Sequence, residues 1–323
     1  MRKIKIGVIG VGYLGKFHAQ KYAAMENVEL VGVADVAMST ACQVADACGT
    51  QAFDDYRKLL LLVDAVSVVV PTPMHHRVTS ECFGAGVDVL LEKPMTVTLE
   101  EADDLIDKAE KGSRILQVGH LERFNPAIVA MQDYLTCPLF IESQRVHSFK
   151  PRGADVDVVL DLMIHDIDII LHVVPSPLKS IDTIGAPVVT KGTDVATAHL
   201  IFENGCAANV TVSRVAHDNV RSLRIYQPGS SLTVNYATKE ITVIERQSVL
   251  TAEGYPKEEV IHFCFTEKDA LQAELTDFIA NVRARRKPMV SGREGRQALE
   301  VALRIIRQIR EHYDRHKDSL CIG

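Results

Sequence analysis

Short apolar runs, each stopped by glycine or proline, alternate with helical segments in the first third of the chain. Residues 4–9 form such a run, which stops at Gly10, and a helical stretch over 14–25 leads to the next run at 28–34. Strands buried on both faces of a parallel sheet read as continuous apolar runs. Further runs cover 64–70, 87–91 and 115–118. The pattern predicts the α/β class, with a Rossmann-type doubly wound parallel sheet at the N-terminus.

Beyond about residue 123, apolar and polar positions begin to alternate. The strand candidates there are 195–202, 207–215, 223–226, 232–236 and 241–245. Asn204-Gly205, between the first two, is a strong signal for a two-residue hairpin. Leu232, Val234 and Tyr236 alternate with polar residues, so one sheet face is expected to be wet or covered by a partner. We predict a second α/β domain with a large open mixed or antiparallel sheet.

The chain of 323 residues is longer than one compact core usually holds, so two domains are expected. We place the first over 1–120 and the second over 121–323. Two helices, over about 267–285 and 295–313, close the chain, and the C-terminal helix could pack back on the first domain. The wet sheet face favours a homodimer or homotetramer, without choosing between them.

Composition and charge narrow the class of protein. Hydrophobic residues make up 47% and charged residues 24%, and the net charge is −6 without any block of like charges. Nothing in this balance favours a nucleic-acid or membrane partner. The apolar N-terminal run is cut by glycines and lacks a signal-peptide cleavage site. The seven cysteines contain no metal-ligand or CxxC spacing, so we expect no metal site and a cytoplasmic, reducing location.

A glycine-rich motif follows the first apolar run and opens the first helix. It reads Gly10-Val11-Gly12-Tyr13-Leu14-Gly15. In this context the first glycine allows the tight turn, the second lets the backbone approach a pyrophosphate, and the third allows close helix–strand packing. The alternative, a purely structural glycine turn, is disfavoured by the acidic residue that ends the second run. The motif predicts a dinucleotide-binding site that includes Tyr13 and Leu14.

Asp35 lies twenty residues after Gly15, at the end of the second run, where its carboxylate could bond both ribose hydroxyls. A carboxylate there would repel a 2′-phosphate, and Val36 and Ala37 offer no guanidinium to hold one. The sequence therefore predicts NAD, with NADP as the less favoured cofactor.

Lys93 stands in the triplet Glu92-Lys93-Pro94, directly after an apolar run. This position is at the carboxyl edge of the predicted sheet, where ligands bind in such folds. The alternative interpretation is a lysine that only bonds loop carbonyls. A charged lysine at this edge could stabilise a developing alkoxide.

His165 lies in an apolar helical stretch, so a packed core histidine is the first interpretation. Two acids change this interpretation, because Asp161 lies one helical turn earlier on the same face and Asp168 lies three residues later. An imidazole with acids in apolar surroundings favours a site over a core position. Asp161 could orient the ring, while Asp168 could cap or pair locally.

Together these motifs resemble the glucose–fructose oxidoreductase/inositol dehydrogenase/MocA-like family. The residues that carry the resemblance are Gly10-x-Gly-x-x-Gly15 with His18, Val70-Pro-Thr72, His75, Glu92-Lys93-Pro94, Asp161-x-x-x-His165 and the ending Pro288-Met-Val-Ser-Gly292. The resemblance implies an NAD(P)-binding Rossmann domain followed by a substrate-binding α/β domain. The open mixed sheet of this second domain would pack at the oligomer interface. It also implies hydride transfer between NAD(P) and a sugar-like alcohol.

The family implies roles for matching positions in this chain. Lys93 corresponds to the motif lysine, His165 to the proton-transfer residue and Asp161 to its companion, and all three would contact the substrate. Thr72 and His75 would line the nicotinamide side, and Glu92 and Lys93 would belong to the cofactor site.

Two stretches, 118–126 and 161–168, look most like a bacterial subgroup, the UDP-N-acetylglucosamine 3-dehydrogenases, which prepare UDP-sugars for amination in lipid A precursors. His120 stands where many relatives have an aromatic residue, and Met163 where many have glycine. Arg123 and Asn125 are candidates for the diphosphate or hydroxyls, whereas the alternative for Arg123 is a salt bridge with Glu122 or Asp133.

The resulting hypothesis is oxidation of the C3 hydroxyl of a UDP-sugar, with His165 as base and Lys93 beside the oxygen, although the two could exchange roles. The second hypothesis is a dehydrogenase of free sugars or cyclitols. The third hypothesis is a sensor that binds a dinucleotide without turnover, and the presence of both Lys93 and His165 argues against it.

Overall fold

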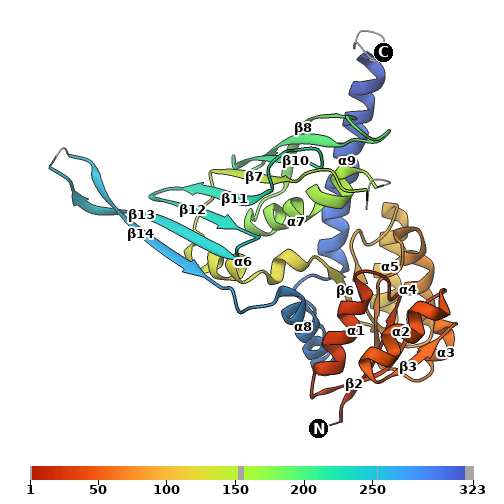
Figure 1. The fold of residues 1–323 in the computed structure, drawn as a ribbon. Coiled ribbons are helices and arrows are strands. Elements are labelled where there is room, and N and C mark those ends of the chain that lie inside the picture. Colours follow the sequence, from red (N-terminus) through yellow and green to blue (C-terminus); the bar gives the residue numbers. More distant parts are fainter. Residues whose placement is uncertain (1, 152–155, 253, 317–323) are drawn as a thin grey trace. The chain divides into compact units, whose positions relative to one another are not determined.

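The computed structural model describes residues 2–151, 156–252 and 254–316. The chain divides into two compact units, one made of residues 1–121 with 270–299 and the other of 122–269 with 300–323. Figure 1 shows the elements of each. The division at residue 120 that the sequence suggested stays a proposal.

The first unit is built on a six-stranded sheet with the order β3-β2-β1-β4-β5-β6, in which each pair of neighbouring strands is parallel. The strands are β1 (Ile4–Ile9), β2 (Val28–Ala34), β3 (Gln51–Phe53), β4 (Ala65–Val68), β5 (Asp88–Glu92) and β6 (Leu116–Gly119). The order reverses beside β1, which makes this a doubly wound Rossmann sheet. The predicted sheet is confirmed.

Helices connect the parallel strands, and because such crossovers are right-handed as a rule, those before and after the reversal are expected on opposite faces. They are α1 (Gly15–Ala24), α2 (Met38–Cys48), α3 (Tyr56–Leu60), α4 (His75–Gly84) and α5 (Leu99–Lys111), with α8 (Ala270–Ala284) added from the far end of the chain. The start of α5 is capped by Thr98, whose side chain accepts a hydrogen bond from the Glu101 N–H.

Apolar side chains of β1, β4 and β5 form one core cluster with α1 and α8. In this cluster Leu275 and Phe278 of α8 are fully buried against Ile6, Val8 and Leu90. The chain therefore returns after about 150 residues to complete the core of its first unit. A sheet face covered from two distant parts of the sequence is the setting for the buried polar groups described below.

The second unit holds an eight-stranded mixed sheet with the order β14-β13-β12-β11-β7-β10-β9-β8. The strands are β7 (Phe140–Val146), β8 (Leu178–Ala186), β9 (Val195–Phe202), β10 (Ala207–Ser213), β11 (Val220–Gln227), β12 (Ser230–Asn235), β13 (Glu240–Leu250) and β14 (Pro256–Cys264). Among the neighbouring strands of this sheet in the described residues, β7 and β10 are parallel and the other pairs are antiparallel. The predicted open mixed sheet is confirmed. A hairpin joins β9 to β10 as expected, but its loop has three residues, 203–205, instead of the predicted two, because Phe202 pairs with Cys206.

Helical segments of this unit pack on one sheet face, whose residues are buried in alternation along the central strands. They are α6 (Pro126–Met131), a π-helical turn over Val159–Met163, α7 (Ile164–Val173) and the end of α9 (Gly292–His316). Figure 1 shows β13 and β14 continuing past the other strands as a two-stranded ribbon.

Candidate active site

The glycine loop after β1 is shaped by steric contact of the backbone. A Cβ atom at Gly15 would lie 1.9 Å from the Gly10 carbonyl oxygen, and Gly10 itself has φ +85°. A Cβ atom at Gly12 would meet nothing within 4 Å. The loop is therefore closed at Gly10 and Gly15 and open at Gly12, as a backbone that approaches a pyrophosphate must be.

Asp35 lies at the end of β2 against this loop. Its carboxylate accepts a hydrogen bond from Val11 N–H and another from Ala37 N–H, each at 2.9 Å. A cavity of about 340 Å³ adjoins the loop, lined by Gly12, Tyr13, Lys16 and residues of α2. The open backbone at Gly12 and the carboxylate at the end of β2 fit the pyrophosphate and ribose of a dinucleotide.

Glu92 and Lys93 end β5 at the same edge of the sheet. The Glu92 carboxylate points into the unit, where its Oε1 lies 3.3 Å from His18 Nε2 and its Oε2 accepts the Lys93 N–H at 3.2 Å. Burial raises the pKa of Glu92, but contact with His18 and the charge of Lys93 lower it more, so the net shift is downward. Glu92 is therefore a buried anion, and Lys93 is half-exposed beside it.

His75 joins two loops of this edge. Its Nδ1 lies 2.9 Å from the Pro94 carbonyl oxygen and its Nε2 lies 2.8 Å from the Val70 carbonyl oxygen. Burial lowers the pKa of His75 more than these carbonyls raise it. A neutral ring has a single N–H and donates to only one of the two carbonyl oxygens. Thr72 begins the short 3₁₀ turn before His75. The ring holds the loops after β4 and β5 together, and the Lys93–Pro94 peptide there is cis.

Asp161 and His165 belong to the second unit, on the π-helical turn and the first turn of α7. From residue 161 to residue 170 they are the two side chains that are not buried. Both therefore lie on the accessible side of an otherwise buried segment. π-helical turns inside helices are frequent at functional sites. This placement leaves the imidazole able to meet a substrate while Asp161 lies on the same side.

The buried acids of α7 hold the helix to its sheet. Asp166 accepts hydrogen bonds from Arg145 Nε at 2.8 Å and from Ser143 Oγ at 2.9 Å. Asp168 receives both Nε and Nη2 of Arg123, at 2.6 and 3.0 Å. The local pairing suggested for Asp168 is thus a long-range one, and it fixes the helix that carries His165.

Arg123 and Asn125, the candidate diphosphate ligands, both have structural partners. Arg123 is 4% exposed and forms an ion pair with Asp168. The alternative interpretation, a salt bridge, therefore holds, but the predicted partners, Glu122 or Asp133, were wrong. Asn125 caps α6 by accepting the Ala127 N–H, and it donates to Glu122. A diphosphate contact by Arg123 would require this ion pair to open.

His120, the remaining candidate, follows β6 and is 1% exposed. Its burial fits pocket lining and core packing alike, so its substrate role stays a prediction. The predicted cofactor residues gather at the carboxyl edge of the first sheet, whereas Asp161, His165, Arg123 and Asn125 belong to the second unit.

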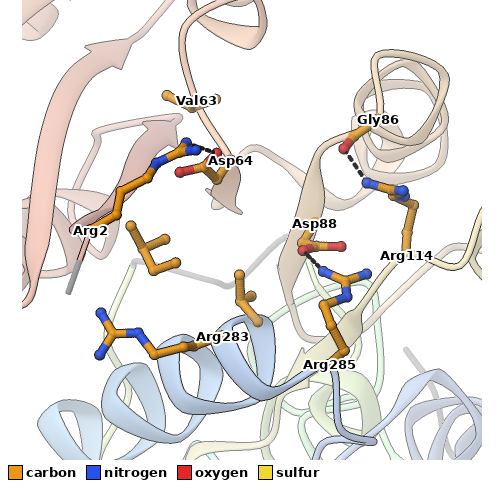
Figure 2. A pocket seen from close by; sticks show the side chains of 10 residues that line it. Arg2, Val63, Asp64, Gly86, Asp88, Arg114, Arg283 and Arg285 are labelled. Carbon is orange, nitrogen blue, oxygen red and sulfur yellow. Dashed lines mark hydrogen bonds and ion pairs between the residues drawn. The ribbon is translucent and has the colours of Figure 1, made fainter.

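A second cavity of the first unit, of about 470 Å³, lies at the amino ends of β1, β4 and β5, away from the glycine loop. Figure 2 shows its charged rim. Arg2 pairs with Asp64 at 2.6 Å, and Arg285 pairs with Asp88. Arg114 donates to the Gly86 carbonyl. These guanidinium groups are occupied by protein partners, and ligands of such sheets bind at the opposite edge.

Within the described residues, no helix is long and apolar enough to cross a membrane. Nor does any cluster of three or more His, Cys, Asp or Glu side chains among them offer a metal site.

A doubly wound sheet with an open glycine loop, an acid at the end of β2 and a lysine at the carboxyl edge defines an oxidoreductase of the nicotinamide-dinucleotide class. Comparison with known families agrees. Residues 4–120 match the oxidoreductase family with an NAD-binding Rossmann fold, and residues 137–232 match the C-terminal domain of the same Gfo/Idh/MocA family. The chain belongs to this family.

Three relatives illustrate the range of the family. The chain is 38% identical to UDP-N-acetylglucosamine 3-dehydrogenase from Acidithiobacillus ferrooxidans, over 94% of this chain and 97% of the relative. A solved structure of that enzyme superposes with a TM-score of 0.90, covering 96% of this chain and 98% of the other. Myo-inositol 2-dehydrogenase from Thermotoga maritima is 27% identical over 92% of this chain and 93% of its own length. Levoglucosan dehydrogenase, 17% identical with a TM-score of 0.84 over 96% and 98% of the two chains, shares the fold.

Proposed function

We propose that this enzyme oxidises the C3 hydroxyl of UDP-N-acetylglucosamine to the 3-keto sugar, with NAD as cofactor. The observation that carries the proposal is the 38% identity, over nearly the whole chain, with a protein that bears this activity in its name. Lys93, Asp161 and His165, the residues that the chemistry needs, are all present.

NAD, when bound, supplies the acceptor for the hydride that leaves the sugar carbon. The residues proposed to hold it are Gly10, Gly12 and Gly15 with Tyr13 and Leu14, together with Asp35, Thr72, His75, Glu92 and Lys93. The open position at Gly12 supports the pyrophosphate contact. The preference for NAD over NADP rests on Asp35, whose charge would oppose a 2′-phosphate.

His165 is proposed to take the hydroxyl proton, with Asp161 holding the ring in the required tautomer. Lys93, as the charged form, stabilises the oxygen as negative charge develops on it. A positioned base contributes about 10²–10⁴-fold, so positioning by the protein must supply much of the remaining acceleration. Lys93 and His165 could exchange these two roles.

A free sugar or cyclitol is the second candidate substrate. The observation in its favour is that Arg123 and Asn125, the basic and amide groups expected to hold a diphosphate, are occupied by Asp168 and Glu122. The full-length similarity to an inositol dehydrogenase is consistent with it.

Absorbance of NADH, on mixing the protein with NAD, UDP-N-acetylglucosamine and a carbonyl trap, tests the proposal. Parallel reactions hold N-acetylglucosamine, glucose or myo-inositol. A signal only with the UDP-sugar supports the proposal, and the trapped product identifies the oxidised carbon. Turnover with the free polyols alone would transfer the assignment to the second candidate.

Lys93→Met tests the catalytic assignment. The variant removes the charge next to the reacting oxygen, so turnover should fall by about 10²-fold or more. NAD affinity should fall much less, because Lys93 is one of ten residues proposed to hold the cofactor. Steady-state kinetics and NADH fluorescence titration measure the two effects. Lys108→Met on α5, whose partners are Asp104 and Ser80, is the matched control. Wild-type turnover in the Lys93 variant would show the assignment to be wrong.

A further inference from the structure

Glu274 is a buried acid for which the reaction has no use. It lies on α8 and is fully buried, and neither of its carboxyl oxygens has a hydrogen-bond partner among the described residues. An ionised carboxylate without a partner in such surroundings would be very costly. The side chain therefore requires either a proton or a compensating group.

The position of Glu274 brings it to the sheet face that carries Glu92. Gln117 of β6 donates its side-chain N–H to the Glu274 carbonyl oxygen at 3.3 Å. β6 pairs with β5 so that Gln117 is opposite Leu90 and Gly119 is opposite Glu92. Since alternate residues of a strand share a face, Gln117, Gly119, Leu90 and Glu92 all face α1 and α8.

The fold leaves a space for the Glu92 carboxylate. A Cβ atom at Gly119 would lie 3.0 Å from the Glu92 carboxyl carbon, so the bare glycine backbone forms one wall. His18 Nε2 and the Lys93 N–H lie against the two oxygens. Tyr22, from the next turn of α1, bonds Ser67 of β4 on the same face at 2.9 Å. We call His18, Tyr22, Ser67, Glu92, Gln117 and Glu274 the buried polar cluster.

The two carboxyl groups of the buried polar cluster, Glu92 and Glu274, cannot both be ionised without a large repulsion. Glu92 has His18 and the Lys93 N–H as partners, and Glu274 has neither. The pKa of Glu274 is raised well above its ordinary value, first by burial and then by the charges of Glu92 and Asp277. The proton of the pair accordingly belongs on Glu274.

We propose that Glu274 is a positioning residue, held as the neutral acid, which braces the Glu92 carboxylate from α8 and thereby fixes the backbone of Lys93 at the cofactor edge. The assignment rests on the proposed role of Lys93. His18 Nδ1 and Gln117 Oε1 are also without hydrogen-bond partners in the described structure.

Three variants distinguish the effect of the Glu274 proton from the effect of the polar side chain as a whole. Glu274→Gln keeps the size and a neutral donor but has no proton to lose. Glu274→Leu removes all polarity at similar volume. Asp277→Asn is the control, because it makes the same carboxyl-to-amide change on the same helix at a half-buried position.

Infrared difference spectra at neutral pH report the proton directly. We expect a protonated-carboxyl C=O band in the wild type that is lost in Glu274→Gln and kept in Asp277→Asn. Persistence of the band in Glu274→Gln, or its absence from the wild type, overturns the protonation. This measurement needs no sugar substrate, so it stands even where UDP-N-acetylglucosamine fails to react.

Thermal unfolding from pH 5 to 9 gives a second readout. The charged and polar groups around Glu274 are His18 and Tyr22 of α1, Ser67 of β4, Glu92 of β5, Gln117 of β6 and Asp277 of α8. Because a neutral Glu274 must hold its proton in the folded state, the Tm of the wild type should fall with rising pH relative to that of Glu274→Gln. Parallel curves would contradict the proposal.

Kinetics test the link to Lys93. Glu274→Leu should lower kcat by about 10–100-fold with little change in the KM for NAD, whereas Glu274→Gln should stay within about threefold of the wild type. Equal losses in both variants, or an unchanged kcat in a folded Leu variant, would overturn the positioning role. If Glu274→Leu does not fold, the pH series on Glu274→Gln still decides the protonation. An inactive wild type with the infrared band present would refute the proposed substrate and leave the protonation of Glu274 standing.

Discussion

At the scale of single residues, the candidate site depends on groups whose chemistry is set by what touches them. Glu92 is an anion because His18 and the Lys93 N–H contact it, while Glu274 lacks such partners on the same sheet face. Asp161 and His165 are accessible in a segment whose other acids are bound by arginine. Residue type alone does not distinguish these acids, because the partners come from distant parts of the chain.

The glycine loop gives a residue-scale prediction. Gly12→Ala should leave the Tm nearly unchanged, because its Cβ meets nothing within 4 Å, but should weaken NAD binding by about tenfold or more by blocking the pyrophosphate. Gly15→Ala should destabilise the protein instead, since its Cβ would lie 1.9 Å from the Gly10 carbonyl oxygen. Calorimetric titration with NAD and thermal unfolding measure the two effects. Unimpaired NAD binding by Gly12→Ala would place the pyrophosphate elsewhere.

At the scale of elements, strands buried on both faces could be predicted from sequence, and elements with weak patterns could not. β1, β2, β4, β5 and β6 are mostly apolar and mostly buried, so their positions were recognisable from the sequence. β14 is nearly all exposed and β3 has only three residues, so neither shows an alternation of apolar and polar residues that would predict a strand. The apolar period of α8 marks it as a helix but does not name the sheet it covers. Glu274 shares the face of Phe278 and Val282 by its i, i+4, i+8 spacing, a signal that could have revealed its burial.

The attachment of α7 gives an element-scale prediction. Asp168→Ala should cost about 3–5 kcal/mol in unfolding free energy, because it leaves the buried Arg123 charge unpaired. Replacing the pair together, by Arg123→Met with Asp168→Leu, should cost much less. Urea unfolding of Arg123→Met, of Asp168→Leu and of the double variant that combines them measures the coupling. Additive losses would mean that the pair contributes nothing.

The same double variant tests the diphosphate role of Arg123. If the folded double variant keeps turnover with UDP-N-acetylglucosamine, Arg123 serves to hold α7. A KM for the UDP-sugar raised by more than about tenfold, without a change in kcat, would instead favour direct binding of the sugar nucleotide.

At the scale of the whole molecule, stability depends on pH through acids whose pKa values shift in opposite directions on folding. The pKa of Glu274 is raised, whereas that of Asp194 is lowered. Asp194 accepts the N–H groups of Val188, Val189 and Thr190 at 2.7–2.9 Å. Burial raises the pKa of Asp194, but these hydrogen bonds outweigh it and lower the value from 3.8 to about 2. An acid whose pKa is lower in the folded state than in the unfolded state stabilises the fold at pH values above its unfolded-state pKa. This stabilisation is lost as the pH falls through its folded-state pKa.

Asp194→Asn should therefore remove about 2 kcal/mol of stability at neutral pH, and the difference from the wild type should shrink between about pH 4 and pH 2. Urea unfolding at a series of pH values measures this. Asp182→Asn, on the preceding strand β8, is the control. A difference that stays constant down to pH 2 would assign the loss to packing instead of charge.

The return of the chain to its first unit also bears on synthesis. When the ribosome has released residues 1–121, six strands of a nucleotide-binding sheet exist, but Leu275, Phe278, Ile279 and Val282 of α8 have not been made. One apolar face, together with the Glu92 carboxylate, then lacks its cover until some 150 further residues have emerged. The unit whose strands are translated first is thus completed only after α8, which belongs to the last fifth of the chain, has been made.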